Sequence, residues 1–342
     1  MQASLLLTSF VFIVAICTLI MQNASGANVG VAYGRAGNNL PSQAQVVSLL
    51  QANNVNKVRI YDTDSGVLEA FQNSNIKLIV SARNDELASL ASGDGASGWV
   101  QSNIVPFASS IEIICVGNEV LTQATQFSQY LYPAILNVYN ALKAASLDTS
   151  IRVSTAHAMD VIDSTHSFPP SAGTFVGAIQ ADMNSILTFL SQTGAPFLGN
   201  VFPFFAYIGA QGQIDLKYTL FQQTAGVDDS NGLHYSNLFD AQVDTLIAAM
   251  EAMGHSDIPV VATESGWPHE GEASATLENA QAYNANLVAH VPMGTPKRPN
   301  VLVSTYIFAL FDENLKPSDP AFEQHFGVFD PSSQSKFYEI SF

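Results

Sequence analysis

Residues 113–119, IICVGNE, and residues 258–268, IPVVATESGWP, are apolar runs that each lead to a glutamate. A carboxylate is costly to bury without a partner, so one placed after an apolar run usually points into a cleft. Glu119 and Glu264 are therefore a candidate pair. If both open on one cleft, one carboxyl can protonate a leaving group while the other attacks a cationic carbon, as glycosidic cleavage requires. Salt-bridged or helix-capping glutamates are the alternative.

Apolar runs of strand length alternate with helical patterns along the rest of the chain. The segment 238–253 is the clearest helix, because its large apolar residues fall near one face. Eight such strand and helix units over about 300 residues favour a closed (β/α)8 barrel over an open sheet. We predict strands at 28–33, 57–61, 77–82, 111–118, 151–157, 197–205, 258–263 and 301–310, and helices at 42–51, 66–73, 126–145, 238–253 and 277–290.

The predicted architecture is a single α/β domain, a (β/α)8 TIM barrel over residues 27–342. Neither a linker nor a charge run divides this part of the chain. Active sites of such barrels lie at the C-terminal face of the strands. Glu119 ends the predicted fourth strand and Glu264 the seventh. We therefore expect a substrate cleft at that face, with both glutamates in it.

The composition limits the partners. Hydrophobic residues make up 47% of the chain and charged residues 12%, which indicates a well-packed globule. The chain has 29 acidic and 12 basic residues, a net charge of −17. Such a surface repels nucleic acid and anionic lipid and favours a neutral or cationic partner.

The N-terminus reads as a targeting segment. Residues 1–26 have no charged side chain, are apolar from 5 to 21, and end in the small residues ASG. This pattern predicts a cleaved secretory signal, although its first residues contain no Lys or Arg; an uncleaved membrane anchor is the alternative. Cys17 would leave with the signal, so Cys115 would stand alone as a buried strand residue and no internal disulfide is expected.

Other motifs predict neither a cofactor nor a metal. Residues 93–98, GDGASG, match G-x-G-x-x-G, but a helix-like stretch precedes them, so we interpret them as a flexible loop rather than a nucleotide site. The seven histidines show no close ligand spacing, and a G-x-S-x-G elbow is absent from the sequence.

The segment 308–317, FALFDENLKP, follows the last predicted strand and contains Glu313 and Lys316 at a spacing of i, i+3. These two side chains can pair and fix a charge at the barrel mouth; a simple surface ion pair is the alternative. Aromatic residues also gather at the predicted strand ends, where they can stack on the apolar faces of sugar rings. They are Tyr33, Tyr61, Phe202, Phe204, Phe205, Tyr207, Trp267, Tyr306 and Phe311.

At these motifs the chain resembles the plant endo-1,3-β-glucanases of glycoside hydrolase family 17. The resemblance covers the mature chain from end to end and in order. It rests on VGVAYG at 29–34, GNNLP at 37–41, RIY at 59–61, VGNE at 116–119, FPPSAG at 168–173, NLFDA at 237–241, TESGWP at 263–268, GTPKR at 294–298 and FALFDENLK at 308–316.

The resemblance implies a barrel with a long cleft and retaining chemistry, with Glu119 as proton donor and Glu264 as nucleophile. Physical reasoning agrees, because carboxyls at the ends of strands four and seven can approach within roughly 5 Å, where ionised Glu264 would raise the pKa of Glu119. The resemblance also implies an auxiliary pair, Glu313 and Lys316, and a subsite at the scissile bond lined by Tyr33, Tyr61 and Asn118. From the strand-end aromatics we add Phe202, Phe204, Trp267 and Phe311 to the predicted substrate-binding residues.

The chain departs from the family pattern in three places. Residues 202–205 read FPFF where the family usually has Tyr-Pro-Tyr-Phe, so two hydroxyls are missing. Other departures are Ala32 in place of a cysteine and residues 246–247 in place of a tyrosine. These changes put subsite affinity in question rather than the chemistry.

The predicted protein is a secreted, monomeric hydrolase of plant defence. We expect it in the apoplast or cell wall rather than in the vacuole, and not bound to a membrane once its signal is removed. It would cut internal 1,3-β-D-glucosidic linkages of neutral 1,3-β-glucans such as callose, laminarin or microbial wall glucan. Two alternatives stay open: hydrolysis of mixed-linkage 1,3-1,4-β-glucan, and a catalytically weak glucan-binding wall protein.

Overall fold

A computed structural model of the chain describes residues 29–342, so the predicted signal at 1–26 and Cys17 lie outside the described residues. Eight parallel strands close into a barrel in which neighbours along the chain are neighbours in space, which confirms the predicted fold. The strands are β1 (Val29–Tyr33), β2 (Lys57–Ile60), β3 (Lys77–Ala82), β4 (Ile111–Asn118), β5 (Arg152–Ala158), β6 (Phe197–Asn200), β9 (Val260–Ser265) and β10 (Thr305–Phe308).

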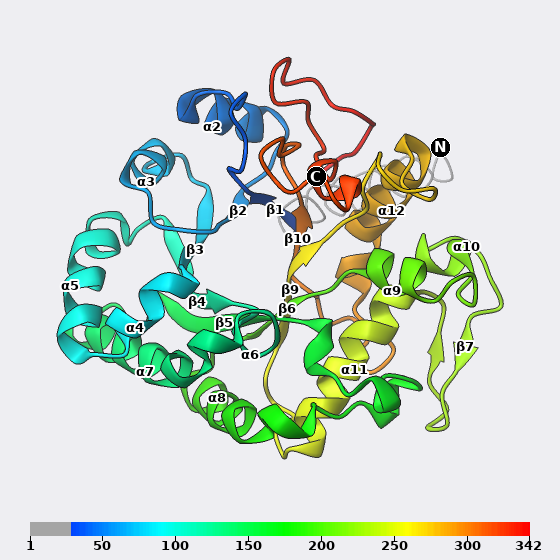
Figure 1. Ribbon diagram of the computed structural model, residues 1–342, viewed down its shortest axis with the longest axis horizontal. Coiled ribbons are helices and arrows are strands. Elements are labelled where there is room, and N and C mark those ends of the chain that lie inside the picture. Colours follow the sequence, from blue (N-terminus) through cyan, green and yellow to red (C-terminus); the bar gives the residue numbers. More distant parts are fainter. Residues whose placement is uncertain (1–28) are drawn as a thin grey trace, which may run out of the picture.

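Helices surround the barrel (Figure 1). A short hairpin of β7 (Val227–Asp228) and β8 (His234–Tyr235) stands apart from the barrel sheet. The α-helices are α2 (Gln43–Ala52), α3 (Ser65–Phe71), α4 (Leu87–Leu90), α5 (Gly93–Asn103), α6 (Val120–Gln123), α7 (Ser128–Ala144), α8 (Gln180–Thr193), α9 (Pro203–Gly209), α10 (Leu216–Thr219), α11 (Leu238–Ala252) and α12 (Leu277–His290).

The apolar residues form two main layers, as expected for strands that are buried on both faces. The larger cluster packs strands against the outer helices. A smaller cluster is made by strand residues alone and includes Ile79, Ile113, Cys115 and Tyr306. Cys115 is a free cysteine and is fully buried, as the sequence predicts.

Three sequence-based assignments need correction. The strand predicted at 197–205 ends at Asn200, because Pro203 occupies the first turn of α9, where its missing N–H is tolerated. The strand predicted at 301–310 is limited to β10. Residues 93–98 are not a flexible loop: they form the first half of α5, where the Ser92 side chain accepts from the backbone N–H of Gly95 (3.2 Å).

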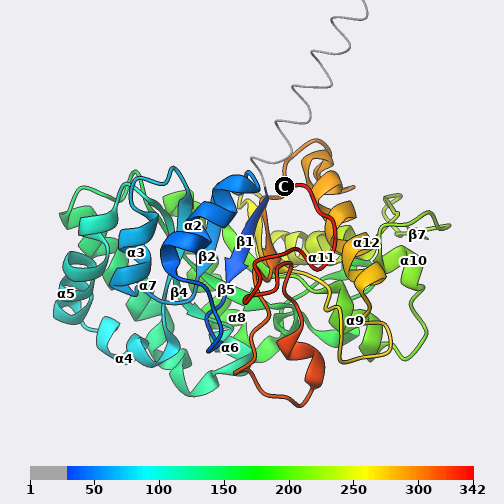
Figure 2. The ribbon, with the colours of Figure 1, turned by 90° about the horizontal axis from the view of Figure 1, so that it is seen from above.

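The chain after β10 extends past the barrel on the side toward which β1 points, as Figure 2 shows in red and orange. This segment contains a short 3₁₀ helix, η9 (Ala321–Gln324), and contributes side chains to the hollow at that face. Among residues 29–342, the helices are all too short or too polar to cross a bilayer.

Candidate active site

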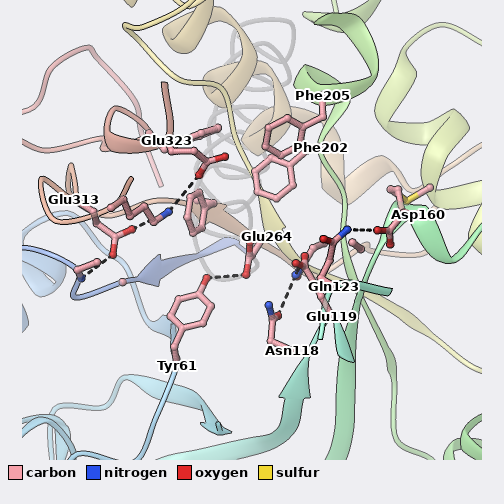
Figure 3. A pocket seen from close by; sticks show the side chains of 18 of the residues that line it. Tyr61, Asn118, Glu119, Gln123, Asp160, Phe202, Phe205, Glu264, Glu313 and Glu323 are labelled. Atoms are coloured by element: carbon pink, nitrogen blue, oxygen red, sulfur yellow. Dashed lines mark hydrogen bonds and ion pairs between the residues drawn. The ribbon is translucent and has the colours of Figure 1, made fainter. Parts of the chain in front are cut away.

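A cavity of about 1250 Å³ opens at the C-terminal ends of the barrel strands. Both candidate glutamates line it, together with most of the other predicted site residues (Figure 3). The predicted residues on its wall are Tyr33, Tyr61, Asn118, Glu119, Phe202, Glu264, Glu313 and Lys316. The structure thus brings together residues that lie up to 283 positions apart, from Tyr33 to Lys316.

Glu119 is aimed into the cavity by an unusual turn. The residue directly follows β4 and adopts a left-handed conformation, with φ 54° and ψ 32°, which a non-glycine residue rarely takes. Its backbone N–H donates to the carbonyl of Ala156 (2.8 Å), and Gly117, at φ 71°, helps to make the turn. Such backbone strain often occurs at functional sites.

The environment of Glu119 favours its protonated form. Burial is the largest effect, the negative charge of Glu264 adds to it, and together they raise the pKa of Glu119 to about 7. The Asn200 amide donates to Oε1 of Glu119 across 2.7 Å, which opposes part of the rise. The expected influence of Glu264 is therefore present, but it ranks second to burial.

Glu264 lies on β9 and is held by two donors at one oxygen. Arg59 Nη1 lies 2.7 Å from Oε1, and the Tyr61 hydroxyl donates to the same atom across 2.8 Å. Within residues 29–342, Oε2 accepts no hydrogen bond from another side chain or backbone N–H. One oxygen is thus fixed by the protein and the other is free to react.

Arg59 and Asn200 connect the two glutamates, and neither residue is among those that the sequence predicts for the site. The Arg59 guanidinium is fully buried and donates to the side-chain oxygens of Asn118 (2.6 Å) and Asn200 (2.8 Å) as well as to Glu264. Asn200 in turn donates to Glu119. The sequence signal that could have identified Arg59 is its place inside the apolar strand 57–61, because a buried arginine needs a partner of opposite charge.

Glu313 and Lys316 form the predicted pair, with Nζ of Lys316 3.2 Å from Oε2 of Glu313. Glu313 also accepts from the backbone N–H of Ala36 (3.0 Å), which ties the segment after β10 to the one after β1. Gly34 makes this approach possible, because a Cβ there would lie 2.2 Å from Glu313 Oε1. Lys316 further lies 3.7 Å from Glu323.

Three of the predicted sugar-binding aromatics do not reach the cavity. Phe204, Trp267 and Phe311 are at most 2% exposed and pack in the core beneath it. The Phe204 ring lies 5.0 Å from that of Trp267, whose indole N–H donates to a backbone carbonyl. An aromatic residue near the end of a predicted strand can thus lie in the core or in the cleft, and the sequence position alone does not distinguish the two.

The aromatics that do line the cavity differ in what they offer. The Tyr61 hydroxyl donates to Glu264, whereas Phe202 contributes only an apolar ring to the cavity wall. Tyr33 borders the cavity but is buried, and its hydroxyl donates to Gln43 Oε1 (3.1 Å). Six carboxylates and three cationic side chains line the wall, so the cleft suits a neutral, hydroxyl-rich ligand better than an anionic one.

Comparison with known proteins gives a consistent result. Residues 29–342 match the family model for glycosyl hydrolases family 17. A glucan endo-1,3-β-glucosidase of Vitis vinifera is 43% identical over 340 residues, 97% of each chain. The acidic isoform GL153 of the same enzyme type from Nicotiana tabacum is 40% identical, over 98% of this chain and 94% of its own length.

Two solved structures are similar over nearly the whole described chain. A β-1,3-glucanase and pollen allergen of Cryptomeria japonica is 51% identical with a TM-score of 0.88, covering 92% of this chain and 99% of its own. A plant β-glucan endohydrolase, from a pair described as having distinct substrate specificities, is 39% identical with a TM-score of 0.86, covering 92% and 100%.

Proposed function

The chain belongs to glycosyl hydrolases family 17, and we propose that it is an endo-hydrolase of 1,3-β-D-glucosidic linkages. The relatives that carry this activity in their names align with this chain over almost its full length. The proposal rests mainly on Glu119 and Glu264, which share one cleft but differ in their hydrogen-bond donors and in their protonation. Glu264 has two donors on one oxygen, whereas burial and the charge of Glu264 raise the pKa of Glu119 to about 7, so that it can carry a proton near neutral pH.

This asymmetry divides the work of a double displacement. Glu119 gives its proton to the leaving glycosidic oxygen while an oxygen of Glu264 attacks the anomeric carbon, which forms a covalent glycosyl-enzyme. Glu119, now ionised, removes a proton from water, and that water releases the sugar from Glu264. Two inversions at the anomeric carbon retain its configuration, so the two carboxyls should lie about 5 Å apart in the substrate complex.

Arg59 and Tyr61 direct this reaction through Glu264. By holding Oε1 they leave Oε2 as the attacking atom, and the positive charge of Arg59 compensates the buried carboxylate. Asn118 is held by the same guanidinium and stands beside Glu119, where its amide can reach a sugar hydroxyl. We assign Glu313 and Lys316 to sugar binding near the acid, because they present a fixed charge pair on the cavity wall.

Hydrolysis of mixed-linkage 1,3-1,4-β-glucan is a second candidate function. The observation that favours it is the likeness to an endohydrolase from a pair with distinct substrate specificities. We do not favour a binding-only role, because a buried Glu264 and a partly buried Glu119 would be costly in a cleft that performs no chemistry.

We propose that the protein is secreted to the cell wall space as a monomer after removal of residues 1–26. The uncharged, apolar N-terminal segment supports the secretory signal. A net charge of −17 suits a neutral polysaccharide partner better than nucleic acid or anionic membrane.

The test is product analysis with purified protein on laminarin, mixed-linkage glucan and a cellulose oligomer. Laminarin should give a ladder of short oligomers whose fresh reducing ends have the retained configuration by NMR. Glu119→Gln and Glu264→Gln should each lower turnover by several orders of magnitude, roughly 10⁴-fold. Glu323→Gln is the matched control, since Glu323 lines the same cavity and, among the charged side chains of residues 29–342, pairs only with Lys316.

Three outcomes would change the assignment. Activity within tenfold of wild type in either glutamine variant would refute the roles given to the glutamates. Faster cutting of mixed-linkage glucan than of laminarin would favour the second candidate. Release of glucose alone from chain ends would refute the endo mode.

A further inference from the structure

Two histidines that are 56 positions apart in the chain meet on one carboxylate beside the barrel mouth. His269 follows β9, and its Nε2 lies 3.1 Å and 3.2 Å from the two oxygens of Asp312. His325 follows η9, and its Nδ1 lies 3.2 Å from Oδ2 of the same residue. The backbone N–H of His269 donates to the carbonyl of His325 (2.9 Å), which holds the two segments together.

Asp312 orients both rings and leaves a second nitrogen of each available. Its position is itself fixed, because Oδ1 accepts from the backbone N–H of Gly327 (2.8 Å). Histidines that bind metals commonly donate their other ring N–H to a carboxylate, which sets the tautomer and the ring orientation. Within residues 29–342, Nδ1 of His269 and Nε2 of His325 have no hydrogen-bond partner.

A third potential ligand stands next to the pair. One ligand atom each from His269, Glu270 and His325 lies within 4.8 Å of the other two. Glu270 is exposed, whereas the His269 and His325 side chains are 7% and 27% exposed. The cluster thus combines ordered nitrogens with a carboxylate that solvent, and a cation, can reach.

We propose that His269, His325 and Glu270 bind a divalent transition-metal cation of the zinc type. Two imidazole nitrogens and one carboxylate oxygen are ligands that Zn²⁺ prefers, and water can complete a tetrahedral site. Calcium and magnesium take mainly oxygen ligands, usually six or more, and would bind this set poorly. None of the three residues lines the catalytic cavity, so the site is separate from the chemistry and does not depend on the proposed function.

The cation would join two segments that both reach the cleft. His269 belongs to the chain that continues from Glu264 on β9, and His325 to the segment that contains Glu313 and Lys316. Because Asp312 immediately precedes Glu313, a metal on the histidines would steady the chain that carries the auxiliary pair. The role assigned to the site is therefore structural, and its loss should lower stability.

The experiment is titration of Zn²⁺ into chelator-stripped protein purified without a histidine tag, followed by calorimetry. We expect one Zn²⁺ per chain, a rise in melting temperature with Zn²⁺ concentration, and no such effect of Ca²⁺. His325→Ala should abolish binding, and Glu270→Gln should weaken it by about tenfold or more. His234→Ala is the control, since it removes a histidine that pairs with a single aspartate elsewhere. Protein loaded with Co²⁺ should show the intense visible absorption of a tetrahedral site.

Glu270→Gln keeps the test decisive if His325→Ala fails to fold, because Glu270 is exposed and its substitution disturbs no packing. Absence of stoichiometric binding in wild type would overturn the proposal. Zn²⁺ affinity in Glu270→Gln equal to that of wild type would overturn it as well, as would a loss of affinity in His234→Ala as large as that in Glu270→Gln.

Discussion

Nη1 of Arg59 lies 2.7 Å from Oε1 of Glu264, and both residues are buried. Removing one partner of a buried ion pair leaves an uncompensated charge, so Arg59→Met should lower the free energy of unfolding by about 3–5 kcal/mol. The double variant Arg59→Met/Glu264→Gln should be more stable than Arg59→Met alone, because it leaves no unpaired charge at this site. Urea denaturation of the three proteins tests this. Equal stability of the single and double variants would show that the pair is not coupled.

The pH dependence of kcat/KM should report the protonation of Glu119. Its pKa of about 7 means that the proton needed by the leaving group is present below that pH and is lost above it. We therefore expect kcat/KM to fall about tenfold per pH unit on the alkaline side.

Two variants should move this alkaline fall in opposite directions. Asn200→Ala should move it to higher pH, because the Asn200 hydrogen bond lowers the pKa of Glu119. Asp160→Asn should move it to lower pH, because the charge of Asp160 raises the pKa. Shifts in the same direction for both variants would contradict this account.

The raised pKa of Glu119 also predicts that the stability difference between wild type and Glu119→Gln depends on pH. A carboxyl whose pKa is raised in the folded state stabilises the fold below its unfolded pKa, and this contribution is lost as the pH rises through the folded value. The relevant window thus runs from about 4.5 to about 7. Across it, Glu119→Gln should gain up to about 3 kcal/mol relative to wild type. Melting curves at pH 4.5 and pH 8 measure the difference, and a gain of similar size at both pH values would argue against the raised pKa.

Sequence reasoning identified the parts of the site whose signal is local. Glu119 and Glu264 each follow an apolar run, and Glu313 and Lys316 are three residues apart, so each feature is visible within a short stretch. Arg59 was overlooked because its role depends on partners from β4, β6 and β9, which only the barrel order brings together. The wrong assignment of Phe204 has a similar cause, since the segment after β10 covers its ring.

Gly34→Ala should reduce activity without straining the backbone. A Cβ at this position would lie 2.2 Å from Oε1 of Glu313, so the Glu313 carboxyl must leave the position in which Ala36 and Lys316 hold it. A displacement of about 1 Å in a positioning group can cost on the order of 100-fold in kcat/KM. Gly98→Ala is the control: nothing lies within 4 Å of its Cβ, and in α5 it should stabilise the protein by up to about 1 kcal/mol. Unchanged activity in Gly34→Ala would mean that Glu313 is not needed where it stands.

Phe202 and Phe204 should respond differently to the restoration of their missing hydroxyls. Phe202 lines the cavity and is 8% exposed, so the hydroxyl of Phe202→Tyr can reach a bound sugar. A hydrogen bond gained only in sugar binding should lower KM, by up to about tenfold, and leave kcat nearly unchanged.

Phe204 is fully buried between Trp267 and Phe322, with ring centroids 5.0 Å and 5.1 Å away. Phe204→Tyr would therefore bury a hydroxyl and destabilise the fold by about 1–3 kcal/mol without improving KM. Michaelis kinetics on laminarin together with thermal melting separate the two effects. A lower KM in Phe204→Tyr would place that ring in the cleft and contradict its buried position.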